Sequence, residues 1–451
     1  MKRILTLLLL AFTLNATDTL TNSLTLNEAI DVLKSKNLEI KSANLAVDSA
    51  KSDEKKSAGL NWGKLEFMQD FARSNDAGNV FGFKLTSREA TFGDFGFSEF
   101  SSTNPNILKV QPQDLNYPGY KNFYQSKLKY EVPLFTGFAI TSYSKIMREV
   151  TKLKGLEKAQ VQNEKIFQLR KSYYDMALLK ESVKHLNTIL SNINILQDTT
   201  QSMIDVGYAK KVDLLEVQAK KGNVHRLLVQ MHSNEKLLYH YISFLLNQKV
   251  TNITTPTSDV SMPNYNDEDI LNNNLDIKKA STGLSIKNNM VSVSKAGYYP
   301  TLGAFGEVAT ADNTFLGKAN EHKAYTLGAR LSWTLFNGGI DSAKIEKSKI
   351  EYLQMQSKLA LAKQGISLKL AKIRTQIKSL DEEIASLNKE LELADTIYEN
   401  YEGRYKEKLA SMSDVIIKQS AQIQKILQLQ VTKNKRNEKI FELEKLANIE
   451  E

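Results

Sequence analysis

Residues 132–137 read VPLFTG, and residues 333–338 read WTLFNG, so one short pattern occurs twice at an offset of 201 positions. Each copy is followed by more than 100 residues without proline, in which apolar residues recur at heptad-like spacing. Asp213 lies 79 residues after Leu134, and Asp414 lies 79 residues after Leu335. This matched spacing predicts that the chain contains two copies of one structural unit.

A second pair of matching segments lies upstream in each half. Residues 37–43 read NLEIKSA, and residues 274–280 read NLDIKKA, at an offset of 237 positions. The first half therefore has 36 extra residues, and the stretch 74–121, rich in Gly, Asn, Asp, Ser and Phe, accounts for them. We expect this insertion to be a long loop between two paired strands, on the outer side of a membrane sheet.

Alternating apolar and polar residues predict four β-strands. The pattern is clearest in the fourth, where large apolar side chains from Tyr325 to Leu335 alternate with small polar groups and one arginine. Such alternation places the apolar side chains on one face of a sheet. The predicted strands cover residues 62–73, 122–135, 299–310 and 324–336. Each has roughly the ten residues of a tilted strand that spans a membrane.

Helical periodicity covers most of the remaining chain. At 1.5 Å per residue, each of two predicted long helices would span roughly 100 Å. A return helix follows each of them, and apolar residues such as Ile373, Ile377 and Leu380 advance by fours and threes, which predicts antiparallel coiled-coil hairpins. The predicted helices are 28–60, 139–206 and 212–247 in a first repeat (17–248), and 267–296, 340–408 and 414–446 in a second repeat (267–451), joined by a linker at 249–266.

Composition and the N-terminus restrict the class of protein. Residues 1–16 have the basic start and the short apolar core of a secretory signal peptide. The chain has no cysteine, which excludes disulfides and thiolate metal sites. Its net charge of +9 arises from charges interspersed along helix faces, so we expect no nucleic-acid binding.

No motif for catalysis or for a metal ion occurs in the sequence. It lacks a nucleophile elbow and a phosphate-binding loop. His225, His232 and His240 are 7 and 8 residues apart, whereas two histidines that share a metal on one helix are four apart. We therefore predict a protein that is not an enzyme and that has neither a cofactor nor a metal site.

Two functional classes fit long hairpins joined to strands. One is a structural coiled-coil scaffold or adhesin of the cell envelope, whose sheet packs on a helix. The other is an export channel. In lipid every strand edge must be paired, and four strands are too few to close a membrane barrel. A channel therefore requires several copies of the chain, with the hairpins arranged around the axis of a shared barrel.

The ordered set of these motifs resembles the TolC family of outer-membrane efflux proteins over essentially the whole mature chain. The resemblance rests on the strand exits at 132–137 and 333–339, the segment AGYYPTL at 296–302, and the triplets at 213–215 and 414–416. It implies an α+β membrane protein that is a homotrimer. A shared 12-stranded transmembrane β-barrel would lie in the Gram-negative outer membrane, and an α-helical barrel would extend through the periplasm.

The resemblance also implies a function and partners. Such a protein is the outer-membrane channel of a tripartite efflux or type I secretion system, which exports small molecules or proteins. Its partners would be the outer-membrane lipid, a periplasmic adaptor (membrane fusion) protein and an inner-membrane pump of the RND, ABC or MFS type.

Three groups of site residues follow from the same resemblance. Tyr405 would bond to Asp213 to close the periplasmic aperture. The full aperture group is Asp213, Tyr405, Asp414 and Arg404. The hairpin tips, where the adaptor docks, are Gly207, Tyr208 and Ala209 in one hairpin and Lys408, Leu409 and Ala410 in the other. The junction from barrel to tunnel comprises Pro133, Gly137, Gly338, Gly339 and Pro300.

The second hairpin departs from the family pattern at its tip. Lys408 replaces the usual glycine, Ala410 replaces an arginine of the closing network, and Ile417 replaces a carboxylate. We therefore expect the second tip to have a different shape, and Arg404 or Arg374 to take over the role of the missing arginine. Capping of the return helices is an alternative role for both aspartates.

Overall fold

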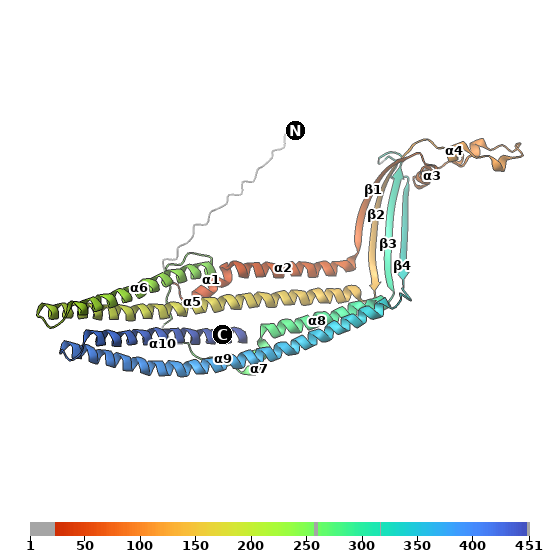
Figure 1. Ribbon diagram of the computed structural model, residues 1–451. Coiled ribbons are helices and arrows are strands. Elements are labelled where there is room, and N and C mark those ends of the chain that lie inside the picture. The colour runs from red at the N-terminus through yellow and green to blue at the C-terminus, as the bar shows by residue number, and fades with distance from the viewer. Residues whose placement is uncertain (1–22, 257–259, 316, 449–451) are drawn as a thin grey trace, which may run out of the picture. The chain divides into compact units, whose positions relative to one another are not determined.

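The computed structural model describes residues 23–256, 260–315 and 317–448 (Figure 1). The predicted signal peptide, residues 1–16, lies outside the described residues. The chain separates into two units. The helical unit contains the described residues up to 48, 152–282 and from 356 onward, and the sheet unit contains residues 49–151 and 283–355.

The sheet unit contains a four-stranded antiparallel sheet in the order β1-β2-β3-β4. Its strands are β1 (Lys64–Ser74), β2 (Lys121–Thr136), β3 (Thr301–Asp312) and β4 (Lys323–Ser332). The two repeats meet in the middle of the sheet, because β2 of the first pairs with β3 of the second. Within the part of the chain that the structure describes, β1 and β4 each have one neighbouring strand, so both outer edges are unpaired.

The two faces of the sheet differ in chemistry. On one face the strand register aligns apolar side chains in two cross-strand rows: Phe67, Leu128, Val308 and Tyr325 in one, and Leu65, Tyr130 and Leu327 in the next. These side chains are exposed, with Phe67 at 68% and Tyr325 at 78%. The opposite face is charged, and there Lys127 pairs with Glu307 at 3.3 Å. A sheet that packed on a soluble core would bury its apolar face instead.

The insertion between β1 and β2 is folded, although the sequence predicts a loop. It contains α3 (Ala77–Thr86), α4 (Gln113–Asn116) and short 3-10 helices at 92–95, 97–99 and 107–109. Aromatic rings hold it together, since Phe81 meets Phe95 edge-on with ring centres 5.0 Å apart. Phe83 of α3 stacks on Phe123 of β2 at 4.3 Å, which attaches the insertion to the sheet.

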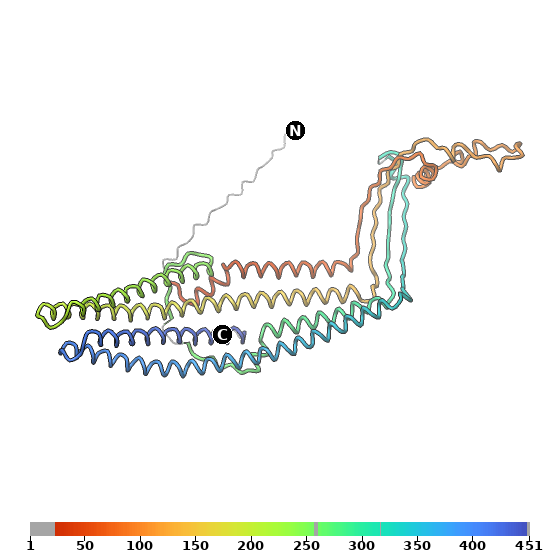
Figure 2. The backbone as a smooth tube through the Cα atoms, viewed as in Figure 1, coloured from red at the N-terminus to blue at the C-terminus, as the bar shows by residue number. Residues whose placement is uncertain are grey.

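Two hairpins of long helices supply most of the helical unit, and the first turns of α5 and α9 belong to the sheet unit (Figure 2). α5 (Ala139–Asp205) and α6 (Lys211–Leu246) form the first, and α9 (Ile340–Lys406) and α10 (Met412–Ala447) form the second. α5 and α9 have 67 residues each, and α6 and α10 have 36 each, so the repeats have hairpins of equal length. Among the helices in the described ranges, none is both long enough and apolar enough to cross a membrane.

Apolar side chains from all four long helices share one core in the helical unit. On α5 the buried positions advance by threes and fours, which is the spacing of knobs-into-holes packing. The core consists of Leu186, Ile189, Ile193 and Leu196 of α5, Val217, Val224 and Leu228 of α6, Tyr398 and Tyr405 of α9, and Met412, Val415, Ile423 and Ile426 of α10. This core joins the two hairpins to each other.

Each repeat begins with two helices where the sequence predicts one. In place of a helix over 28–60, the structure has α1 (Leu26–Lys36) and α2 (Leu38–Gly59). In place of a helix over 267–296, it has α7 (Asp267–Asn273) and α8 (Leu275–Lys295). Asn37 and Asn274, which are equivalent in the repeat, interrupt the helices.

The interruption is caused by hydrogen bonds of the two buried asparagine side chains. Asn37 Nδ2 donates to the carbonyl of Leu245 at 2.8 Å, and Asn274 Nδ2 donates to the carbonyl of Leu446 at 3.0 Å. The Oδ1 atom of each accepts backbone N–H groups from the first turn of the next helix, among them that of Ile40 at 3.0 Å. Each asparagine therefore caps one helix and holds the end of a return helix.

Replacing Asn37 with alanine is expected to lower the free energy of unfolding by about 1–2 kcal/mol, because it removes a cap and leaves a buried carbonyl without its donor. Asn37→Asp keeps the capping oxygen but turns a second oxygen toward the buried carbonyl of Leu245, so it is expected to lose at least as much. Urea unfolding of the purified protein, followed by circular dichroism, measures both. An unchanged midpoint in Asn37→Ala would contradict the bridging role.

The second copy of the repeated motif lies outside the sheet. β4 ends at Ser332, which pairs with Thr301, the first residue of β3. Residues 333–336 of the predicted strand 324–336 therefore have no part of β3 left to pair with. In the first repeat, β2 pairs with β3 as far as Thr136, so residues 132–136 remain in the sheet.

Candidate functional site

The turns at the ends of the two hairpins have the same backbone conformation. Gly207 and Lys408 occupy equivalent positions, and both are left-handed, with φ of 78° and 64°. In each turn the next residue donates its N–H to the carbonyl five positions back, Tyr208 to Met203 and the residue after Lys408 to Arg404, both at 2.7 Å. The expected difference in shape at the second tip is therefore absent, although a non-glycine residue in this conformation costs about 1 kcal/mol.

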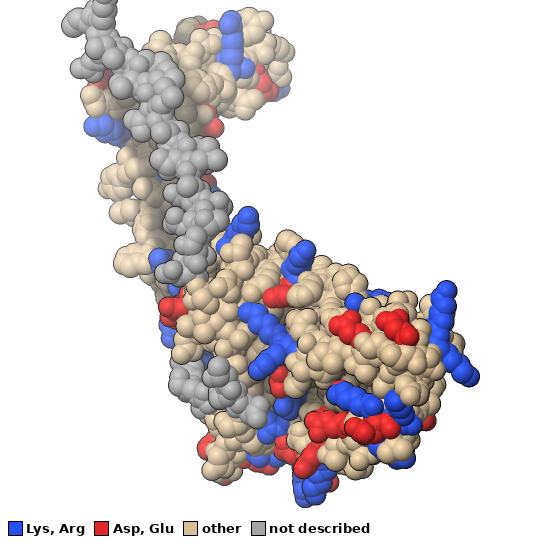
Figure 3. Space-filling model, turned by 90° about the vertical axis from the view of Figure 1, so that its left-hand side faces the viewer, with Lys and Arg blue, Asp and Glu red and all other residues tan. Residues whose placement is uncertain are grey.

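A side-chain contact joins the two tips. Lys408 Nζ lies 3.2 Å from the centre of the Tyr208 ring, a cation–π arrangement that the sequence did not indicate. Figure 3 shows acidic and basic side chains interspersed over this end of the helical unit. Apolar side chains are also exposed here, including Val206 at 65% and Leu409 at 68%. The tips thus combine exposed apolar side chains with charges of both signs.

Tyr405 lies in the core that joins the two hairpins. Its ring is buried, and its hydroxyl donates to Thr200 Oγ1 of α5 at 3.2 Å. Thr200 in turn donates to the carbonyl of Leu196 at 2.7 Å. Burial raises the pKa of the Tyr405 phenol, and the charge of Asp213 raises it further. Among the described residues the partner of Tyr405 is therefore Thr200, whereas the family pattern predicts Asp213.

Asp213 and Asp414 make the bonds of helix caps. Asp213 accepts the backbone N–H of Lys210 at 2.7 Å. Asp414 accepts the hydroxyl of Ser411 at 2.6 Å, and the Ser411 hydroxyl accepts the Asp414 N–H at 3.2 Å, which completes a capping box. The Ser411 hydroxyl, followed by the Ser411 N–H, lowers the Asp414 pKa, and the positive charge of Arg404 contributes. The bonds observed for both aspartates are those of the capping alternative.

The two arginines considered for the closing network lie in different places. The Arg404 guanidinium lies 5.5 Å from the centre of the Tyr401 ring, and Lys418 Nζ lies 5.1 Å from the same ring. Arg374 donates to the carbonyl of Tyr265 at 2.6 Å, beside the segment that leads into α7. Arg404 is therefore the arginine at the tip, close to Asp414.

Gly137 connects β2 to α5, and its surroundings require glycine. It has φ of 60°, and a Cβ atom there would lie 2.7 Å from the carbonyl oxygen of Ala296 and 2.9 Å from Tyr299 Cβ. The next residue, Phe138, is also left-handed, with φ of 68°. Its ring meets those of Phe135 and Tyr299 edge-on at 5.2 Å and 5.8 Å. Sequence reasoning missed Phe138, because a left-handed phenylalanine has no signature in sequence.

The junction in the second repeat has more space. Gly338 and Gly339 are left-handed, with φ of 67° and 83°, but a Cβ atom at Gly338 would meet nothing within 4 Å. Pro133 lies where the pairing of β2 with β3 becomes irregular, and Pro300 immediately precedes β3. Of the predicted junction residues, the structure places Gly137 against the segment just before Pro300, and Gly338 has no such neighbour.

A sequence model of the family described as Outer membrane efflux protein matches residues 268–445, which is most of the second repeat. Among curated protein sequences, none matches this chain. The family match therefore covers the predicted tip, return helix and β3–β4 hairpin of one repeat.

Solved structures match the fold over both repeats. CusC, whose crystal structures concern folding and transmembrane channel formation, aligns at 13% identity with a TM-score of 0.78, covering 94% of this chain and 91% of CusC. The outer membrane protein VceC of Vibrio cholerae aligns at 12% identity with a TM-score of 0.76, covering 94% of this chain and 96% of VceC.

The CmeC outer membrane channel of Campylobacter jejuni aligns at 12% identity with a TM-score of 0.75, covering 94% of this chain and 85% of CmeC. At these identities the alignments establish a common fold. The chain therefore has the fold of these outer-membrane channels, and its residues 268–445 match the outer membrane efflux protein family in sequence.

Proposed function

We propose that three copies of the chain form one export channel, in which their sheets close a 12-stranded barrel and their helical hairpins enclose a tunnel through the periplasm. The observation that carries this proposal is the sheet itself. Its apolar face is exposed, its other face is charged, and β1 and β4 lack outer neighbours in the described chain. In a shared barrel the apolar face would contact lipid, and the charged face would contact water inside. The outer edges of β1 and β4 would pair with neighbouring copies.

The hairpin tips are the proposed docking surface for a periplasmic adaptor, which connects the channel to an inner-membrane pump of the RND, ABC or MFS type. Two features support this proposal. The tips combine exposed apolar groups with charges of both signs. The two hairpins are also equal in length, so both tips of one chain reach the same distance along the tunnel.

Three measurements test the channel. Purified protein is expected to migrate as a trimer in SDS gels before heating, and to conduct ions across a planar lipid bilayer. A strain that lacks the gene is expected to become sensitive to dyes, bile salts and antibiotics. Loss of a secreted protein instead would indicate type I secretion. A protein that forms trimers without conducting would favour an envelope scaffold.

We further propose that the bond between Tyr405 and Thr200 helps to hold the aperture closed. It joins α9 of one hairpin to α5 of the other inside the shared core. Asp213 stabilises the start of α6 in this proposal, and Asp414 with Arg404 adds charge at the mouth. Ile417, which is 58% exposed, replaces a carboxylate there, so we expect weaker block by cations than in channels that carry a carboxylate ring.

Tyr405→Phe is expected to increase single-channel conductance in planar bilayers, because it removes about 1 kcal/mol from the contact between the hairpins while keeping the ring in the core. Thr200→Val removes the other half of the same bond. The double variant should conduct like either single one, because the two residues act as a pair. Thr188→Val, which removes only a hydroxyl bond to the carbonyl of Lys184 on the same helix, is the control with unchanged conductance. Unchanged conductance in Tyr405→Phe would refute the role of this bond.

A further inference from the structure

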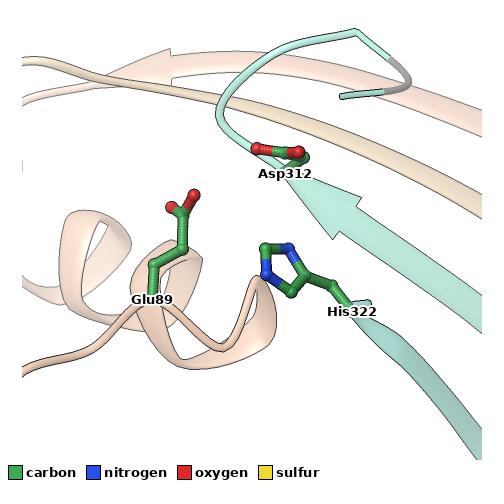
Figure 4. Close-up of side chains that lie close together, drawn as sticks. All are labelled: Glu89, Asp312 and His322. Atoms are coloured by element: carbon green, nitrogen blue, oxygen red, sulfur yellow. The ribbon is translucent and has the colours of Figure 1, made fainter. Parts of the chain in front are cut away.

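Three possible metal ligands from separate segments meet at one end of the sheet (Figure 4). Glu89 follows α3 in the insertion, Asp312 ends β3, and His322 immediately precedes β4. One ligand atom from each residue lies within 4.8 Å of the other two. All three residues belong to the sheet unit.

The imidazole of His322 is held in the form that binds a metal. The side chain is only 8% exposed, and its Nδ1 faces the carbonyl oxygen of Ala311 at 3.2 Å. A carbonyl oxygen can only accept, so Nδ1 carries the hydrogen and Nε2 presents a lone pair. Within the described chain, no residue donates a hydrogen bond to Nε2, and Figure 4 shows the imidazole beside the carboxylates of Glu89 and Asp312.

Neighbouring groups fix the orientation of Glu89. Its backbone N–H donates to the carbonyl of Lys84 at 2.9 Å, after Arg88 has turned the chain with a φ of 56°. Glu89 Oε2 accepts a hydrogen bond from Lys121, and also from the hydroxyl of Ser87 at 3.2 Å. These bonds hold one oxygen and leave Oε1 available. Outer-shell bonds of this kind orient the carboxylates of metal sites.

The carboxylate of Asp312 is held by the backbone of the β3–β4 turn. Oδ1 accepts the N–H of Asn313 at 2.6 Å and that of Thr314 at 3.4 Å, and Oδ2 accepts the N–H of Lys318. Each carboxylate oxygen has two lone pairs, so Oδ2 keeps one for a further partner. The site therefore offers one fixed imidazole nitrogen and two fixed carboxylates.

We propose that Glu89, Asp312 and His322 bind a divalent transition-metal ion of the zinc class, which fastens the insertion to the β3–β4 hairpin. One nitrogen and two carboxylate oxygens suit Zn²⁺, whereas Ca²⁺ and Mg²⁺ prefer ligand sets made of oxygen alone. The ion would offset the two negative charges, of which Lys121 now offsets one. Zn²⁺ bonds of about 2.0–2.2 Å require the three ligands to approach slightly, and water would occupy the fourth position.

Isothermal titration of ZnCl₂ into the full-length protein, solubilised in detergent and freed of metal with EDTA, tests the site. We expect one Zn²⁺ per chain, and at least tenfold weaker binding in both His322→Gln and Glu89→Gln. His232→Gln is the matched control, because His232 faces Glu235 at 3.4 Å on the exposed surface of α6. It should bind Zn²⁺ like the unaltered protein.

Three results would overturn the proposal. They are absence of Zn²⁺ binding by the unaltered protein, unchanged binding in both site variants, and displacement of Zn²⁺ by an equal concentration of Ca²⁺. Circular dichroism and trimer migration in SDS gels check that the variants are folded. If His322→Gln does not fold, Glu89→Gln decides the question, because glutamine keeps an oxygen that accepts from Lys121 and Ser87.

Discussion

Replacing Leu327 with arginine is expected to abolish the assembled protein in the outer membrane. Leu327 lies in the middle of β4 on the apolar face of the sheet, and it is 76% exposed in the single chain. Arginine on the lipid-facing side of a barrel, near the middle of the bilayer, costs about 2–4 kcal/mol. A trimer carries this cost three times, which removes most of the stability of a typical folded protein.

The neighbouring residue supplies the control for this prediction. Thr326 points to the opposite face and pairs across the strands with Glu307, so Thr326→Arg places its charge beside a carboxylate. Unheated SDS gels of outer-membrane fractions should show trimers for Thr326→Arg and none for Leu327→Arg. Equal amounts of trimer in the two variants would mean that the apolar face does not contact lipid.

Much of the fold follows from two sequence signals. The matched spacing from Leu134 and Leu335 to the two aspartates predicts hairpins of equal length, and the structure has them. Period-two alternation predicts the sheet and its apolar face. Both signals are local patterns repeated along the chain, so they can be recognised without knowledge of the tertiary contacts. The structural matches confirm the fold class, and the family that the motifs resemble matches residues 268–445 in sequence.

Other features depend on contacts between distant segments and were therefore predicted wrongly or not at all. Asn37 ends a helix because its side chain reaches the carbonyl of Leu245, more than 200 residues away. β4 stops at Ser332 because β3 offers no further partner, although the alternation in sequence continues to 336. Local periodicity contains no information about where this helix or this strand ends.

The candidate sites also include some that local motifs reveal and others that depend on contacts between distant segments. The tips and junction glycines were located through motifs, whereas Thr200, the hydroxyl partner of Tyr405, has no motif of its own. The proposed metal ligands Glu89, Asp312 and His322 come from three segments, so a search for ligand pairs at helical spacing passes over them. The sequence predicts no metal site for that reason.

Replacing Gly137 with alanine is expected to lower the free energy of unfolding by about 3 kcal/mol. Two effects add at this position. A φ of 60° costs a non-glycine residue about 1–2 kcal/mol. The new Cβ would also lie 2.7 Å from the carbonyl oxygen of Ala296, and such overpacking against backbone costs about 1–3 kcal/mol.

Gly338→Ala separates these two effects, because Gly338 has a similar φ of 67° and open space around its Cβ position. It should lose only the backbone part, about 1 kcal/mol. Urea unfolding of the purified trimer, followed by circular dichroism, compares both variants with the unaltered protein. The difference between them measures the contact of the β2–α5 junction with residues 296–299. Equal losses of unfolding free energy would show that residues 296–299 move aside for the new Cβ atom without a measurable cost. The backbone conformation alone would then explain why glycine is needed where the strand passes into the helix.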